Sequence, residues 1–397
     1  MTSPRRLALY ALALTACGAD PPPSTQSCGA FAGPALRASV SPTQLAVVGV
    51  SPRYDAGRVR ALSLGDLAMR QLPIEATGDT VVRALGTTLA LLHRAVGNQD
   101  NLTLFDPRTG AVCQVPLVTD AEARASRSRP SANGHDALAV DDGHLYVARY
   151  AMHSVAVIDV AAGAVASTVD LASEVAPGEG VYPDALARVG DEVWVTLQRF
   201  DDDDALLANP TRPGLVARID PRTHARIGAY SLTNPNPYGP LVASADGRAR
   251  LVTTFGSYNV IGDGAVESID VATGAVTVLV REDDPGITGN LDAVAVVDAR
   301  HLVLRVSAER RGTAALDDLR VILFDLETRA ATLLLRASQW GAAAPVVVGD
   351  RIFVGDPGSG PYHAGAGVRV YSSQGAELRS IVAMEAGLMP YDVQPMR

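Results

Sequence analysis

The sequence contains no lysine, so arginine supplies all 34 of its basic side chains. Against 43 aspartates and glutamates they leave a formal charge of −9, and the arginines are not gathered into a basic patch. Proteins that bind nucleic acid use such patches to neutralise phosphates. The charge pattern therefore disfavours nucleic acid as a partner.

Several catalytic and cofactor motifs are also missing. The chain has no Gly-x-Ser-x-Gly elbow, no His-Glu-x-x-His pair, no Cys-x-x-Cys-His sequence and no glycine-rich nucleotide fingerprint. These absences exclude an α/β-hydrolase, a c-type haem protein and a protein that binds nucleotides through the common glycine-rich motifs. Aromatic residues make up only 5% of the chain, while alanine, valine and leucine are abundant, which suits tightly packed short strands.

The apolar run from Leu7 to Leu14 is too short to cross a bilayer as a helix, which needs about 20 residues. It follows the basic pair Arg5 and Arg6 and precedes small residues that end at Cys17, which is the order found in bacterial lipoprotein signals. We expect residues 1–16 to be a signal peptide and Cys17 to carry lipid. An ordinary cleaved secretory signal is the alternative.

Residues 17–40 are rich in proline, serine, glycine and alanine and show no periodicity, so we expect a flexible tether behind the lipid. Gly18 is not the aspartate typical of inner-membrane retention, which favours the outer membrane of a bacterial envelope. Besides Cys17, the sequence contains Cys28 and Cys113. Because an exported protein occupies an oxidising compartment, we expect these two to form a disulfide that holds the tether against the body. Two unpaired thiols are the alternative.

One short phrase recurs about every fifty residues between apolar segments. Its aspartate can bond to its own backbone to start a turn, and its last residue can adopt the left-handed conformation that closes the turn. Such a period with four short strands per unit is typical of a β-propeller. The copies begin at Asp106, Asp159, Asp220, Asp270 and Asp325.

A second phrase, an aspartate followed by small apolar residues, opens four of the units, at Asp136, Asp184, Asp292 and Asp392. Further units without the aspartate begin near residues 240 and 344, and residues 79–117 make another such unit. Residues 44–74 contain only the last three strands of a unit, and the C-terminal segment after Pro390 has only the first. We therefore expect an all-β fold over residues 41–397: seven four-stranded antiparallel blades, closed by pairing of the C-terminal strand with the N-terminal blade. Six or eight blades are the alternatives.

The pattern resembles the YVTN family of seven-bladed propellers, which are exported relatives of the quinoprotein-dehydrogenase propellers. The resemblance is carried by Leu145-Tyr-Val-Ala-Arg149 for the second strand and Ile158-Asp-Val-Ala-Ala-Gly163 for the turn, and it covers most of residues 44–397. It implies the fold and an exported binding protein, and it does not imply a chemistry.

Elaborate loops lie on only one predicted face of the propeller, the face where blade connects to blade. Variable loops on one face of a rigid scaffold are a usual place for binding, although they can also be surface loops without a task. The long loops join the second and third strands of five units, at residues 94–101, 199–214, 256–265, 307–319 and 355–367.

Asp136, Asp184, Asp292 and Asp392 share one position at the start of the innermost strand, so they should ring the mouth of the central channel on this face. Carboxylates around one axis could bind a hard cation such as Ca²⁺. The alternative is a structural role in which each aspartate caps its own strand by bonding to nearby backbone amides.

Two further features on this face could carry chemistry. The acidic run from Asp201 to Asp204 lacks the spacing of an EF-hand and reads better as a solvated loop than as a Ca²⁺ site. His135, beside Asp136, is the one histidine placed for proton transfer, because its neighbours are carboxylates.

The favoured function is a lipid-anchored binding or scaffold module without catalysis and without a required cofactor. Its partners would be the membrane, through the lipid on Cys17, and an unknown envelope protein, glycan or small molecule on the loop-rich face. Tyrosine rings with a polar tip suit such a surface. The residues we expect to bind are Tyr182, Asp184, Tyr238, Tyr258, Asn290, Asp292, Tyr391 and Asp392.

The rival function is a metal-dependent lactonase or lyase. In that case Ca²⁺ or another divalent ion would be held by oxygens of Asp136, Asp184, Asn290, Asp292 or Asp392 and would polarise a substrate carbonyl. At least three of these oxygens would then have to lie within about 2.6 Å of one point.

Overall fold

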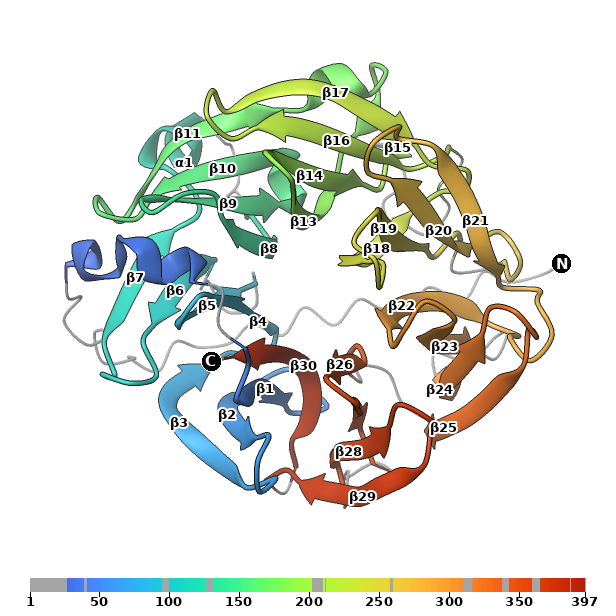
Figure 1. Cartoon of the computed structure of the whole chain (residues 1–397). Coiled ribbons are helices and arrows are strands. Elements are labelled where there is room, and N and C mark those ends of the chain that lie inside the picture. The colour runs from blue at the N-terminus through green and yellow to red at the C-terminus, as the bar shows by residue number, and fades with distance from the viewer. Residues whose placement is uncertain are drawn as a thin grey trace, which may run out of the picture.

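The computed structural model describes residues 27–38, 41–94, 100–125, 131–201, 210, 212–257, 260–309, 316–337, 343–358, 365–385 and 387–396. Within these residues the chain forms seven four-stranded antiparallel sheets arranged as a ring around one axis (Figure 1). The predicted number of blades is therefore confirmed. No helix in this described part is long and apolar enough to cross a membrane.

The blades are numbered from the N-terminus, and their strands run outwards from the axis. Blade 1 joins the last strand of the chain to the first three, and each later blade is continuous in sequence. The strands of blades 1 to 3 are β30(Met389–Met396), β1(Gln44–Val50), β2(Gly57–Ser63), β3(Met69–Ala76); β4(Thr80–Leu85), β5(Thr88–His93), β6(Asn101–Phe105), β7(Val112–Pro116); β8(Gly134–Ala139), β9(His144–Arg149), β10(Ser154–Asp159) and β11(Ala164–Asp170).

Blades 4 to 7 follow the same plan. The strands are β13(Pro183–Val189), β14(Glu192–Leu197), β16(Leu215–Asp220), β17(Ala225–Ser231); β18(Pro237–Ala243), β19(Ala249–Thr254), β20(Ala265–Asp270), β21(Val276–Arg281); β22(Asn290–Val296), β23(His301–Glu309), β24(Leu316–Asp325), β25(Ala331–Ala337); β26(Val346–Val348), β27(Arg351–Asp356), β28(Gly367–Ser372) and β29(Glu377–Ala383).

Small elements decorate the ring. A two-stranded ribbon pairs β12(Glu179–Gly180) with β15(Phe200–Asp201), so it ties a connector between blades to a loop between strands. The helical segments are α1(Asp120–Ala125) and the 3₁₀ turns η1(Cys28–Phe31), η2(Pro34–Arg37), η3(Tyr150–Met152) and η4(Ala172–Glu174).

The recurring aspartate phrase forms the outer turn of five blades, as its residues predict. The Asp270 carboxylate accepts the Thr273 backbone N–H at 2.7 Å, and Gly274 closes the turn with a φ of +73°. His224 and Arg329 occupy the closing position in two other blades and also have positive φ. Side-chain capping by the aspartate is therefore strong enough to hold a non-glycine residue in the left-handed region there.

Circular closure is made by β30, which pairs antiparallel with β1 and places Val48 opposite Asp392 (Figure 1). β1 is almost wholly buried and β30 is mostly buried, because each is covered by a neighbouring blade on either side. Closure of this kind removes the free strand edges of an open sheet. The expected pairing of the C-terminal strand with the N-terminal blade is thus confirmed.

Residues 27–38, which the sequence analysis assigned to the flexible tether, pack on the body instead. Cys28 forms a disulfide with Cys113 on β7, with the two Cα atoms 5.2 Å apart. Phe31 and Leu36 are buried in the core between blades 2 and 3. The propeller therefore includes this segment, because its apolar side chains outweigh a composition that otherwise suggests a linker. Residues 1–26, including Cys17, lie outside the described residues.

Candidate functional site

Three of the four ring aspartates bond to the backbone of another blade, whereas Asp292 pairs with Arg305 of its own blade. Asp136 on β8 accepts the Leu186 backbone N–H of blade 4 at 2.7 Å. Asp184 on β13 accepts the Gly239 N–H of blade 5 at 2.9 Å. The structural role that we expected therefore needs a correction: three of the aspartates chiefly fasten their blade to the next one, and only Asp136 also caps its own strand.

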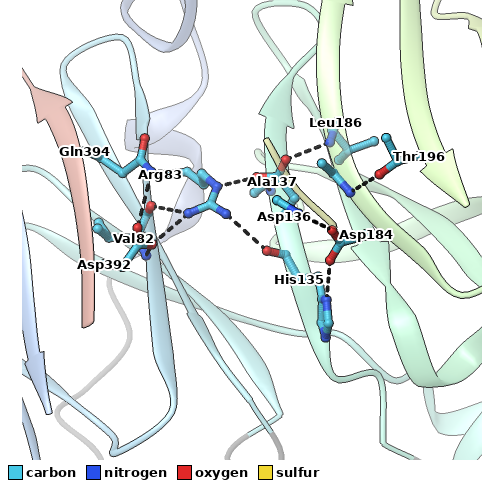
Figure 2. Close-up of polar contacts among 12 residues, drawn as sticks. Val82, Arg83, His135, Asp136, Ala137, Asp184, Leu186, Thr196, Asp392 and Gln394 are labelled. Atoms are coloured by element: carbon cyan, nitrogen blue, oxygen red, sulfur yellow. Dashed lines mark hydrogen bonds and ion pairs between the residues drawn. The ribbon is translucent and has the colours of Figure 1, made fainter. Parts of the chain in front are cut away.

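Arg83 on β4 lies between two of these carboxylates (Figure 2). Its Nε donates to Asp136 of blade 3, and its Nη1 donates to Asp392 of blade 1 at 2.8 Å. Burial alone would lower the pKa of Arg83, but the two carboxylates raise it, so the guanidinium stays charged. Arg83 of blade 2 therefore forms ion pairs with carboxylates of blade 3 and of β30, and so links the three blades.

His135 forms an oriented pair with Asp184. Its Nδ1 lies 2.7 Å from Asp184 Oδ1, and its ring stacks on Tyr150 with centroids 4.1 Å apart and planes 5° from parallel (Figure 2 shows the Asp184 contact). An ionised carboxylate can only accept, so Nδ1 carries the proton and Nε2 is the unprotonated nitrogen. Burial lowers the pKa of His135, the Asp184 hydrogen bond opposes this, and Arg94 lowers it further. The ring is therefore neutral at neutral pH.

A third group joins Arg94, Asp79 and Tyr391. The Arg94 guanidinium donates to the Tyr391 hydroxyl at 2.8 Å, and that hydroxyl donates to Asp79 at 2.8 Å. Arg94 Nε also lies 3.1 Å from the Asp79 carboxylate. Burial raises the pKa of Tyr391 well above its usual value, so the phenol remains a proton donor.

Arg305 and Tyr238 form a fourth group, while Tyr54 packs edge-on against Tyr391 of the third group, with ring centroids 5.6 Å apart. Arg305 on β23 donates to Asp292 on β22 at 2.6 Å. Burial raises the pKa of Tyr238, with Asp184 acting in the same direction and Arg305 opposing it, so this phenol is near side chains of blades 4 and 6. Among the described residues, neither the Tyr238 hydroxyl nor the Tyr54 hydroxyl has a hydrogen-bond partner.

These side chains come from six of the seven blades and face one another across the axis, and we call the set the polar hub. The four ring aspartates are buried, whereas other hub side chains are only partly buried: that of His135 keeps 14% of its exposure, Arg94 16% and Arg83 23%. The polar hub comprises Tyr54, Asp79, Arg83, Arg94, His135, Asp136, Asp184, Tyr238, Asp292, Arg305, Tyr391 and Asp392.

The ring aspartates do not assemble a metal centre. Across the described residues, no three His, Cys, Asp or Glu side chains lie where they could hold one ion. Asp136 and Asp392 face Arg83, Asp292 faces Arg305, and Asp184 faces His135. The carboxylates that were candidates for Ca²⁺ are thus already compensated by side-chain and backbone donors.

The other predicted binding residues have separate places. Tyr182 has a φ of +41° and packs against Tyr150, His153 and Phe200, beside the hub. Asn290 begins β22 between blades 5 and 6. Tyr258 and Asp202 to Asp204 lie outside the described residues. Asp201 is described, and it lies 3.2 Å from Arg212 in an ion pair.

Sequence reasoning missed the cations of the polar hub. Arg83, Arg94 and Arg305 lie in or after strands that are otherwise apolar. A charged residue inside an apolar strand, as in Val81-Val82-Arg83-Ala84, is the signal that could have found Arg83, because such a charge is buried only with a partner.

Comparison with known proteins matches the chain by fold but not by sequence: no family model and no curated protein matches. The periplasmic gluconolactonase of Pseudomonas aeruginosa is 18% identical, with a TM-score of 0.54 over 88% of this chain and 98% of that one. A functionally unknown protein from Desulfotomaculum acetoxidans is 10% identical, with a TM-score of 0.51 over 89% and 99%. Hydrazine synthase of Kuenenia stuttgartiensis is 16% identical, with a TM-score of 0.50 over 74% and 76%.

The chain is a seven-bladed β-propeller. At these identities the likeness shows the fold alone, and propellers of one architecture serve many unrelated tasks. The function has to be argued from the polar hub.

Proposed function

We propose that this propeller is an exported, lipid-anchored binding protein that takes a small hydroxyl-rich molecule of the sugar class at the polar hub. One observation carries the proposal. The hydroxyls of Tyr54 and Tyr238 have no partner among the described residues, and they share the hub with Arg94, Arg305 and the unprotonated Nε2 of His135.

The chemistry of these groups favours a sugar. A phenol both donates and accepts, a neutral imidazole nitrogen accepts, and a guanidinium only donates, so the site matches a ligand that offers many hydroxyls. Tyrosine rings also provide apolar faces for the C–H surface of a sugar ring. Most hub carboxylates are already paired with arginines, which leaves little uncompensated charge to attract a simple cation.

The anchor part of the proposal rests on the N-terminal sequence. A lipid on Cys17 would hold the propeller at a bacterial membrane, the outer one in a two-membrane cell. Radiolabelled palmitate fed to expressing cells should appear in the wild-type chain and be absent from Cys17→Ser. Label that persists in the variant would contradict the anchor and leave the hub proposal intact.

Ligand binding is tested by saturation-transfer NMR of the mature chain against a panel of monosaccharides, sugar acids and sugar lactones. Tyr238→Phe and Tyr54→Phe should each weaken binding, because they remove only a hydroxyl. Tyr230→Phe is the matched control: this tyrosine lies on the outer strand β17, against Trp194 and Arg218. Binding that is equally strong in all three variants, or absent for the whole panel, would contradict the proposal.

The His135–Asp184 pair supports a second candidate, the hydrolysis of a sugar lactone. In this reaction His135 Nε2 would take a proton from water as the water oxygen adds to the lactone carbonyl. The ring C–O bond would then break, and the alkoxide would recover the proton, so that lactone plus water gives the hydroxy acid. The gluconolactonase that shares this fold makes glucono-lactone a reasonable first substrate.

The two candidates are separated by turnover. Lactone opening can be followed as acid release, with His135→Gln compared with wild type. A rate that falls by at least about a hundredfold, the usual contribution of a general base, would support the enzyme. Binding without any turnover would support the binding protein alone.

A further inference from the structure

The junction between blades 5 and 6, away from the polar hub aspartates, contains two carboxylates pressed against a glycine-rich loop. The Asp263 carboxylate accepts the Ser257 N–H at 3.0 Å, and a Cβ on Gly256 would collide with it. The Glu282 carboxylate accepts the N–H groups of Gly262 at 2.9 Å and Gly264 at 3.1 Å. Glu282 thus grips the backbone on both sides of Asp263.

Two asparagine side chains reach the same loop from opposite ends. Asn290 Nδ2 donates to the Ser257 carbonyl at 3.3 Å, and Asn236 Nδ2 donates to the Gly256 carbonyl at 3.0 Å. A carbonyl can only accept, so the amide orientation is fixed in both cases: the nitrogen bonds to the loop carbonyl, and this bond does not use the oxygen.

The oxygens of both amides are left over. Asn290 keeps 6% of its exposure and Asn236 keeps 1%, and the Oδ1 atom of each is buried without a hydrogen-bond partner in the described structure. Buried acceptors are nearly always satisfied, so an orphan oxygen requires a donor or a cation that the protein does not supply. Two such oxygens flank one loop.

Asn290 is connected to Glu282 as well as to the loop. Glu282 also accepts the N–H of Leu291, the residue after Asn290, at 2.9 Å. Ser257 contacts both Asp263, through its N–H, and Asn290, through its carbonyl. Short chains of hydrogen bonds therefore connect the two carboxylates and the Asn290 amide: Ser257 links Asp263 to Asn290, and Glu282 bonds to the neighbours of both residues.

No described cation compensates this group. Two other buried or half-buried carboxylates on the loop-bearing face have one: Glu122 pairs with Arg149 at 2.8 Å and Glu179 with Arg199 at 3.1 Å. Neither Asp263 nor Glu282 forms an ion pair within the described residues.

We propose that this junction binds a Ca²⁺ ion through the carboxylates of Asp263 and Glu282 and the amide oxygen of Asn290, with water completing the shell. Ca²⁺ takes oxygen ligands of this mixture, carboxylate, amide and water. Across the described residues, no three His, Cys, Asp or Glu side chains lie where they could hold one ion. The proposed site is consistent with this result, because its third protein ligand is an asparagine. The ion would fasten blade 5 to blade 6, which is one of the junctions that no ring aspartate bridges.

The experiment is a titration of the chelator-treated mature chain with Ca²⁺, followed by calorimetry and by Tb³⁺ luminescence. We expect a single ion per chain, and a loss of affinity of at least about tenfold in both Glu282→Gln and Asp263→Asn. Glu267→Gln is the matched control, because Glu267 is a buried glutamate of the same blade whose oxygens are filled by Thr233 and Asn234. Asp184→Asn controls for the hub.

A variant that should bind Ca²⁺ more tightly keeps the test decisive if Glu282→Gln and Asp263→Asn fold poorly. Asn290→Asp replaces an amide oxygen with a carboxylate and should tighten Ca²⁺ binding. The proposal is overturned if the wild-type chain binds no Ca²⁺, or if binding is unchanged in Glu282→Gln and Asp263→Asn, or if Asp184→Asn abolishes it. None of these outcomes bears on sugar binding at the hub, so the two proposals fail separately.

Discussion

The carboxylate of Asp392, on the last strand of the chain, accepts the backbone N–H of Val82 at 2.9 Å and so fastens blade 1 to blade 2. Asp136 and Asp184 make the same bond to blades 4 and 5. In three of its four copies, the aspartate that recurs at the start of the innermost strand thus fastens one blade to another. Its spacing reflects the assembly of the ring.

Asp392→Ala should destabilise the protein by about 2–4 kcal/mol, because a buried N–H loses its acceptor and Arg83 loses one of its two carboxylates. Asp392→Asn keeps an acceptor and should lose less. Urea unfolding of each variant measures the change. The exposed Glu75→Ala is the control, and an alanine variant at Asp392 as stable as this control would contradict the fastening role.

Arg83→Met should lose about 3–5 kcal/mol of stability, because it leaves Asp136 and Asp392 as uncompensated charges at the axis. Adding Asp392→Asn to Arg83→Met removes one of those charges. The double variant should therefore be more stable than the sum of the single effects predicts. If the effects of the two substitutions simply add, Arg83 and Asp392 do not stabilise the protein through their contact.

The disulfide should contribute about 2–5 kcal/mol, because it closes a loop of 85 residues in the unfolded chain. Thermal unfolding of Cys28→Ser/Cys113→Ser, or of the wild-type chain in a reductant, measures this contribution. Thiol titration of the unfolded, unreduced wild type should find neither cysteine free. Equal melting temperatures with and without reductant would rule out a stabilising bond.

His93 should make the protein sensitive to acid. Its ring is buried between the hydroxyls of Thr80 at 3.1 Å and Thr103 at 3.0 Å, and burial lowers its pKa to about 4. The unfolded state takes up the proton first, so stability is complete above about pH 6.5 and is lost as pH falls towards 4. The loss attributable to His93 is roughly 3 kcal/mol.

His93→Gln removes this titration and retains a hydrogen-bonding side chain. The difference in unfolding free energy between pH 7.5 and pH 4.5 should therefore be smaller in the variant than in wild type. Identical pH dependence of the two proteins would show that His93 is not held neutral by its site.

The ring was predictable because its signals are local. An aspartate that caps its own turn, as Asp270 does with Thr273, imprints a repeat on the sequence, and the count of repeats gives the blades. The orphan strand around Asp392 also followed from this count, since a three-stranded first unit needs a fourth strand from elsewhere.

The partners at the axis were not predictable, because they join residues that are far apart in sequence. Asp392 and Val82 are 310 positions apart, and no turn or period connects them. The same holds for residues 27–38: their composition indicates a linker, whereas Phe31 and Leu36 join an apolar core cluster of blades 2 and 3 that only the folded ring assembles.

The central claim, that the polar hub is a ligand site, is tested most directly by a crystal structure of the mature chain grown with a sugar selected by NMR. The account predicts electron density for the ligand in contact with the Tyr238 hydroxyl and His135 Nε2, with Arg94 or Arg305 donating to a ligand oxygen. Density for the sugar at the outer strands, with the hub side chains unchanged, would contradict it.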